Sequence, residues 1–107
     1  MPEQSAPEEL RDIAPKLVDV TNDVLFGDIW NRPGLSPRDR SLVTVSTLAA
    51  LYRGEQLDYH LGVALDNGLS VRELSEAITH LAFYAGWPNA MTAIKRLKKI
   101  ADQRDSS

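Results

Sequence analysis

The fold is decided by residues 55–90, which read EQLDYHLGVALDNGLSVRELSEAITHLAFYAGWPNA. Leucine and alanine recur at helical spacing in both halves of this stretch, which predicts two amphipathic helices. Asn67-Gly68 between the halves favours a left-handed end for the first helix, which is expected to span residues 55–66. Ser70 and Glu73 have the spacing of a capping box, so the second helix should begin directly after Ser70.

The sequence on either side extends this helical pattern. Downstream, Gly86-Trp87-Pro88 breaks the second helix, and a final helix should restart there and run to about Gln103. Upstream, Ser36-Pro37 is typical of a helix start, and residues 41–53 read SLVTVSTLAALYR before Gly54 ends that helix. This helix is apolar almost all round, which predicts burial on several sides. Because one short domain offers little core, part of its surface is expected to face another subunit.

The remaining sequence completes an all-α prediction. Residues 1–7 contain two prolines and are expected to form a flexible N-terminal arm. Residues 8–104 should form a single domain of five to six helices, followed by a tail at 105–107. The first helical stretch should be kinked or restarted at Pro15, and residues 26–35 predict a loop because they contain a Pro-Gly pair.

The composition excludes several classes of function. The chain has 107 residues, and 15 acidic against 12 basic residues give a net charge of −3, which offers no basic surface for nucleic acid or an anionic membrane. No apolar run approaches the roughly 20 residues that span a bilayer, and no secretory signal is evident, so we expect a cytoplasmic protein. There is no cysteine and only two histidines, which argues against disulfides, thiol chemistry and a metal site.

His60 is the first candidate for chemistry, because histidine exchanges protons near neutral pH. Gln56 lies one helical turn before it, on the same face. Glu55 lies five residues before it, about 140° away around an ideal helix, and can join it only from a frayed helix start or from another subunit. The alternative is a surface or hydrogen-bonded core histidine, and spacing alone favours that alternative.

Five other side chains are candidates for binding a substrate. Arg40 precedes the apolar run and is either a bidentate ligand for a substrate carboxylate or part of a structural ion pair. His80 and Tyr84 are four residues apart on one helix, where they either line a pocket or lie in a helix interface. Trp30 and Trp87 stand at loop–helix junctions, where they either wall a pocket or pack in a core or interface.

Four short motifs occur in order along the chain. They are R-x-R-S-L at 38–42, E-x-L-x-x-H at 55–60, A-L-x-N-G at 64–68 and Y-A-G-W-P-x-A at 84–90. Together with FGDIWNRPGLSPRDRSLVTVSTLAAL at 26–51, they resemble the carboxymuconolactone decarboxylase family over roughly residues 20–98. The resemblance implies the all-α fold shared with alkylhydroperoxidase D. It also implies a homo-oligomer, often a trimer or a hexamer, with sites near subunit interfaces.

The resemblance also separates two kinds of chemistry within the family. The peroxidase branch uses Cys-x-x-Cys-x-x-x-His and an upstream glutamate. His60 matches the histidine of that pattern, but Arg53 and Gln56 stand at the cysteines and Ser41 stands at the glutamate. The resemblance therefore implies a lyase of the decarboxylase branch, not a thiol peroxidase. Such an enzyme acts in aromatic-compound degradation on a small carboxylated lactone such as 4-carboxymuconolactone.

The decarboxylase branch implies a role for each candidate residue and no cofactor, because the lactone carbonyl is itself the electron sink. We expect His60 to transfer a proton and Glu55 to orient it or act as a second acid–base group. Arg40 should hold the substrate carboxylate, and His80 is a weaker candidate for stabilising the oxyanion. Two alternatives stay open: a Cys-free relative with another small-molecule activity, and a non-catalytic oligomeric binding module.

Overall fold

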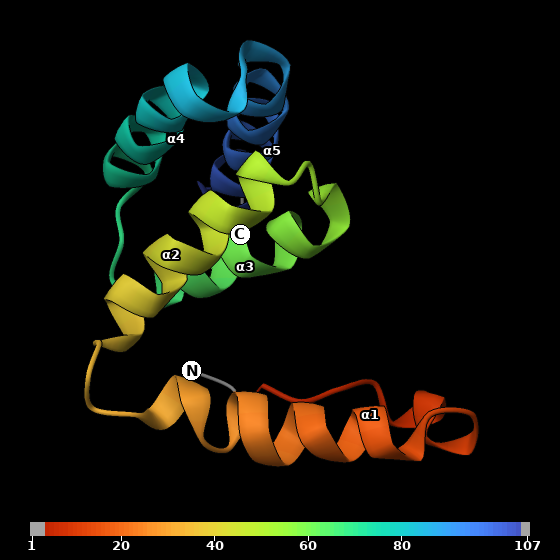
Figure 1. The fold of residues 1–107 in the computed structure, drawn as a ribbon. Helices are drawn as coiled ribbons and strands as arrows, with labels where there is room; N and C mark the ends of the chain where they lie inside the picture. The colour runs from red at the N-terminus through yellow and green to blue at the C-terminus, as the bar shows by residue number, and fades with distance from the viewer. Residues whose placement is uncertain (1–3, 106–107) are drawn as a thin grey trace. The chain divides into compact units, whose positions relative to one another are not determined.

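The computed structural model describes residues 4–105, and every regular element in that range is a helix (Figure 1). The all-α prediction is therefore confirmed. The first three residues of the expected arm and the last two of the expected tail lie outside the described residues. The described chain packs as two units, one ending at Pro37 and one beginning at Arg38, and the domain boundaries drawn from the sequence stay a prediction.

The N-terminal unit consists of four short helical segments. They are the 3-10 helix η1 (Glu8–Asp12), α1 (Pro15–Val20), the π-helix η2 (Thr21–Phe26) and the 3-10 helix η3 (Ile29–Asn31). Pro15 begins α1, as expected for a residue that lacks an N–H donor and starts a helix more easily than it continues one. The N–H of Ala6 donates to Oδ1 of Asn22 over 2.7 Å, which ties the described part of the arm to this unit. The loop predicted over 26–35 is wrong at η3, where backbone hydrogen bonds close a 3-10 turn.

The second unit is a bundle of four helices, drawn from yellow to blue in Figure 1. They are α2 (Pro37–Ala50), α3 (Gly54–Asp66), α4 (Val71–Ala85) and α5 (Trp87–Asp105). Both α3 and α4 pack along α5. The final helix begins one residue before the predicted Pro88 and ends two residues after the predicted Gln103.

The connection between α2 and α3 differs from the prediction. Helix α2 ends at Ala50, and Gly54 begins α3 instead of ending α2. The chain turns at Tyr52, whose φ of 61° lies in the left-handed region that glycine usually occupies at a helix end. A Cβ on Gly54 would lie 2.5 Å from Nη2 of Arg96 in α5, so a larger residue here would displace the guanidinium.

The connection between α3 and α4 follows the prediction. The N–H of Leu69 donates to the carbonyl of Ala64 over 3.0 Å, and the N–H of Gly68 donates to the carbonyl of Leu65 over 3.2 Å. These two bonds form a Schellman motif, and they require the left-handed φ of 102° found at Gly68. The predicted capping box then opens α4, and both of its hydrogen bonds measure 3.0 Å.

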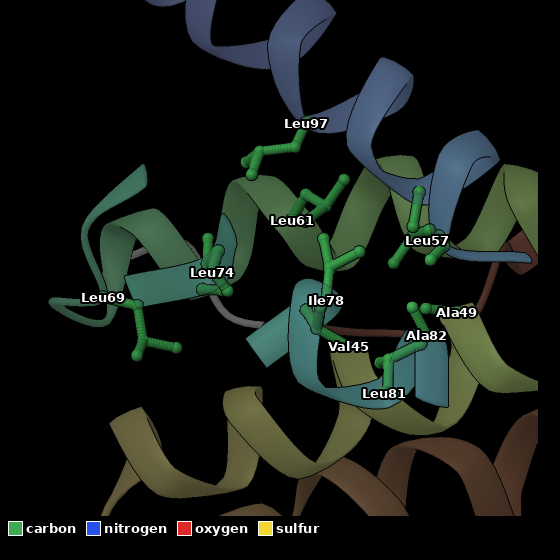
Figure 2. Packing of buried hydrophobic residues seen from close by; sticks show 13 residues of the cluster. Val45, Ala49, Leu57, Leu61, Leu69, Leu74, Ile78, Leu81, Ala82 and Leu97 are labelled. Atoms are coloured by element: carbon green, nitrogen blue, oxygen red, sulfur yellow. The ribbon is translucent and has the colours of Figure 1, made fainter. Parts of the chain in front are cut away.

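The core of the second unit lies where the four helices face one another (Figure 2). Its largest fully buried side chains are aliphatic, and they are Leu57, Leu61, Leu74, Ile78 and Val45. Each contributes about 1.5–3 kcal/mol relative to exposure. The prediction that α2 is buried on several sides is wrong within one chain. The helix buries only the stripe of Ser41, Val45 and Ala49, while Val43 on another side stays 56% exposed.

Candidate functional site

His60 lies in the middle of α3 and is half-buried. The ring of Tyr59 meets it edge to face, with the ring centres 5.0 Å apart and the planes at 84°. Burial lowers the pKa of His60 below its ordinary value, because the loss of water disfavours the charged imidazolium. The ring is therefore mainly neutral at pH 7 and suited to exchange a proton with a bound molecule.

Glu55 lies in the first turn of α3 and is exposed to solvent. Because α3 runs unbroken from Gly54, no bend separates Glu55 from His60, and their side chains leave the helix about 140° apart. Gln56 shares the face of His60 but is also exposed. Within one chain, α3 does not bring Glu55 to the face of His60, and a meeting of the two between chains stays a prediction.

Arg40 lies near the start of α2 and is half-buried. The ion pair that joins this end of α2 to α4 is made by Arg38, which contacts Glu73 and also Asp39, the latter at 3.2 Å. Two residues correspond to about 200° around a helix, so Arg38 and Arg40 leave α2 on different sides. The use of Arg40 for a substrate carboxylate stays a prediction.

Ser41 stands where the peroxidase branch has a glutamate, and its contact is structural. It is fully buried, and its Oγ accepts a hydrogen bond from Nδ2 of Asn67 over 2.9 Å, which ties the start of α2 to the end of α3. Arg53 and Gln56, at the positions of the peroxidase cysteines, are exposed around the start of α3. None of these three side chains can carry out thiol–disulfide exchange.

Four rings form an exposed stripe from α4 to the start of α5, and we name them the aromatic surface. His80 and Tyr84 lie 5.1 Å apart between ring centres, and Phe83 meets Trp87 edge to face at 5.9 Å. Phe83, Tyr84 and Trp87 are 75%, 81% and 59% exposed. The expected neighbours His80 and Tyr84 do meet, whereas the sequence did not single out Phe83. Trp30 is half-buried in η3, within the N-terminal unit.

A groove of about 480 Å³ lies between the starts of α2 and α4. Its lining combines apolar and charged side chains, which are Leu42, Leu69, Ala77, Arg38, Arg72, Glu73 and Glu76. The two arginines and two glutamates balance in charge, so the groove has no net attraction for an anion. Neither His60 nor Arg40 lines this groove.

The described residues form neither a metal-binding cluster nor a membrane-spanning helix. Among them, no group of three or more His, Cys, Asp or Glu side chains is placed to hold a metal ion. Within the same range, every helix is too short or too polar to cross a bilayer.

The last helix, α5, holds α3 at two places. Arg96 donates through Nη1 to Oδ2 of Asp58 over 2.7 Å and to the carbonyl of Gly54 over 3.1 Å. Eight residues further along α5, Arg104 makes the same two kinds of contact, with an aspartate over 3.0 Å and a glycine carbonyl over 2.9 Å. The glycine and the aspartate are four residues apart in each case, so one turn of α3 presents both acceptors together. The helix that carries His60 is thereby fixed near both of its ends.

A model of the carboxymuconolactone decarboxylase family matches residues 15–99 of the chain. The chain belongs to this family. It is 36% identical to the 4-carboxymuconolactone decarboxylase of Acinetobacter baylyi over 93 residues, which cover 87% of this chain and 69% of that protein. The matched region includes His60, Glu55, Arg40 and the aromatic surface of this family member.

Two further relatives match this chain over smaller shares of their own lengths. The nitrosuccinic acid decarboxylase of Metarhizium robertsii is 36% identical over 81 residues, which are 75% of this chain and 57% of that protein. An uncharacterised 15.0 kDa protein of Paracoccus denitrificans is 27% identical over 85 residues, which are 78% of this chain and 63% of that protein. The chain therefore spans less than two thirds of either relative.

Proposed function

We propose that this family member is a cofactor-independent decarboxylase of a small carboxylated lactone such as 4-carboxymuconolactone. Its similarity to two proteins named as decarboxylases supports the class of reaction. The observation that carries the proposal is the environment of His60, which is half-buried on α3 and has a pKa lowered by burial. Such a group is suited to proton transfer with a bound molecule.

The proposed reaction needs an electron sink and one proton. The bond between the ring carbon and the carboxylate breaks, CO₂ leaves, and the electron pair moves into the conjugated lactone carbonyl. The resulting anion is then protonated on carbon, so one proton is taken up for each CO₂ released. The lactone carbonyl accepts the electrons, which makes the substrate its own electron sink.

His60 supplies the proton in this proposal. A lowered pKa makes its imidazolium a stronger acid than that of an exposed histidine, and the negative charge of bound substrate favours the protonated form. After the transfer, the neutral ring takes its next proton from solvent. Arg40 holds a substrate carboxylate through two parallel hydrogen bonds, and His80 is a weaker candidate for donating to the oxyanion.

A homo-oligomer, a trimer or a hexamer, is part of the proposal. Since α3 keeps Glu55 away from the face of His60 in its own chain, Glu55 reaches the site of a neighbouring subunit. The aromatic surface supports assembly, because three large rings that are mostly exposed are unusual in a protein that works as a monomer.

The direct test replaces His60 by Ala or Gln and follows CO₂ release from 4-carboxymuconolactone. Turnover should fall by at least about a hundredfold, because the proton donor is lost. Gel filtration and circular dichroism should show an unchanged oligomer and helix content. Gln103→Ala, exposed near the end of α5, is a control that should keep the wild-type rate. Wild-type turnover by His60→Gln would refute the proposal.

The same assay separates the alternatives when other acids are offered. Nitrosuccinic acid and simple keto acids also place an electron-accepting group near a carboxylate. Release of CO₂ from one of these, but not from the lactone, would keep the class of reaction and change the substrate. Saturable binding of the lactone without turnover would instead support the binding-module alternative.

A further inference from the structure

The turn between α2 and α3 is held on both sides by α5. On the α2 side, Nδ2 of Asn89 donates to the carbonyl of Ala50 over 2.8 Å. On the α3 side, Nη1 of Arg96 donates to the carbonyl of Gly54 over 3.1 Å. The two contacts fall on the last residue of α2 and the first residue of α3, so α5 fixes both ends of the turn that leads to Glu55.

The turn lacks a side-chain cap at the start of α3 and has an unfavourable backbone conformation at one residue. The side chain of Arg53, the residue that precedes α3, makes no capping hydrogen bond to the first turn. Helix starts without such a cap are less stable by about 1 kcal/mol. Tyr52 also adopts a left-handed φ of 61°, which a residue with a Cβ tolerates poorly. Two backbone hydrogen bonds hold the turn from inside, from the N–H of Tyr52 to the carbonyl of Ala49 over 3.2 Å and from the N–H of Arg53 to the carbonyl of Leu48 over 2.9 Å. The contacts from α5 add to them on the side of α3, where no side-chain cap is present.

The contact of Arg96 is closely fitted. Its guanidinium lies where a side chain on Gly54 would be, because a Cβ there would approach Cζ of Arg96 to 2.6 Å. Its second acceptor, Asp58, lies one turn further along α3 at 2.7 Å. Both charged side chains are about one third exposed, so water weakens this ion pair only in part. One side chain thus joins the first two turns of α3.

We propose that Arg96 is a positioning residue for Glu55. It holds the first turn of α3 in helical form and so presents the Glu55 carboxylate at a fixed place. This inference rests on the proposed function, in which Glu55 orients the proton-transferring histidine or acts as a second acid–base group. Displacement of a catalytic group by about 1 Å costs up to about a hundredfold in rate, so a loosened first turn should lower kcat.

Arg104 provides a matched control at the other end of α3. It contacts Asp66 over 3.0 Å and the carbonyl of Gly62 over 2.9 Å, the same chemistry as the Arg96 contact. Arg96→Ala and Arg104→Ala each remove one arginine from one aspartate and one glycine carbonyl. The two contacts differ in how close they lie to Glu55 along α3. Glu55 directly follows Gly54, the partner of Arg96, and precedes Gly62, the partner of Arg104, by seven residues.

The test combines kinetics with a double-mutant cycle. Arg96→Ala should lower kcat about tenfold or more with little change in KM, and Arg96→Lys should restore part of the loss. Arg104→Ala should stay within about twofold of wild type. In a Glu55→Gln background, Arg96→Ala should cost nothing further, because its effect runs through Glu55. Equal losses in kcat from the two alanine variants, or an undiminished loss in the Glu55→Gln background, would overturn the inference.

Amide hydrogen exchange gives a readout that does not depend on activity. Arg96→Ala should speed exchange in residues 53–58 beyond its effect on the rest of α3, and Arg104→Ala should leave those residues protected. If wild type shows no decarboxylation, the proposed function fails while this exchange pattern still supports the positioning of Glu55. If both variants change exchange in residues 53–58 alike, the positioning role is excluded whatever the activity.

Discussion

At the scale of single residues, His60 links the stability of the protein to pH. Burial lowers its pKa in the folded state, so below its ordinary pKa the unfolded chain binds a proton that the folded chain does not. The free energy of unfolding should therefore be unaffected by this group well above about pH 6.5 and should fall as pH drops below it.

Urea denaturation at about pH 8 and about pH 5 measures this effect. The loss of stability on acidification should be smaller in His60→Gln than in wild type, because the variant has no ring to protonate. His80→Gln, which replaces the exposed histidine of α4, is the matched control. An equal loss in wild type and His60→Gln would show that burial of His60 does not contribute to acid sensitivity.

His60 could be identified from the sequence as a candidate, but its surroundings could not be predicted. Its place in E-x-L-x-x-H identified it, whereas its half-buried state depends on side chains from other helices. The structural ion pair that was one alternative for Arg40 stays a prediction, whereas the pair between α2 and α4 made by Arg38 was not predicted. Its partner Glu73 lies 35 residues away, at a distance along the chain over which helical spacing carries no information.

At the scale of the element, two glycines of α3 offer a comparison within one helix. A Cβ on Gly54 would lie 2.5 Å from Nη2 of Arg96, so Gly54→Ala should push Arg96 out of its hydrogen bonds. The expected loss is about 1–2 kcal/mol in the free energy of unfolding. A Cβ on Gly62 would lie 3.4 Å from Nη2 of Arg104, which is ordinary contact. Gly62→Ala should therefore be neutral or stabilise by up to about 1 kcal/mol through helix propensity.

Urea denaturation of the two variants checks this pair, since both make the same chemical change in the same helix. Gly54→Ala should unfold at lower urea than wild type, and Gly62→Ala should not. A Gly54→Ala protein as stable as wild type would mean that Arg96 finds equivalent partners elsewhere. It would also weaken the case that Arg96 fixes the first turn of α3.

Some helix boundaries could be predicted from the sequence, and one could not. The end of α3 and the start of α4 depend on Asn67-Gly68 and on the capping box, which act through hydrogen bonds only a few residues long. The end of α2 is closed by equally short-range bonds, from Tyr52 to Ala49 and from Arg53 to Leu48, but the left-handed residue is a tyrosine, so the sequence did not mark it. Gly54 was interpreted as a helix end, yet it serves the approach of Arg96, which lies 42 residues away.

At the scale of the whole molecule, charge is unevenly distributed along the chain. Charged residues make up 25% of the sequence, but none occurs between Ala77 and Ile94. This uncharged stretch contributes Ile78, Leu81 and other side chains to the core and places the aromatic surface in solvent. The sequence predicted an excess of apolar surface on α2, where Val43 is exposed, and did not predict the exposed rings of α4 and α5. Which surfaces would meet in the proposed oligomer could not be predicted, because no local pattern of a single sequence specifies them.

The aromatic surface should carry contact between subunits in the proposed oligomer. Burying a phenylalanine or tyrosine ring removes on the order of 150 Å² of surface from water, which is worth about 3–4 kcal/mol. An uncharged patch also meets its own copy without repulsion, which favours a second copy of this chain over a charged partner. Phe83→Ser combined with Tyr84→Ser should therefore raise the dissociation constant of the assembly at least a hundredfold, by roughly 3 kcal/mol.

Sedimentation across a range of protein concentrations measures that shift. Lys99→Ser, exposed on α5, is the control, and it should sediment as wild type does. A wild-type protein that stays monomeric at every concentration would exclude the oligomer and, with it, the contribution of Glu55 from a neighbouring subunit. If the double variant assembles as tightly as wild type, the contact lies elsewhere. Other exposed apolar side chains of the second unit, Val43, Leu51 and Tyr59 among them, are then the next candidates.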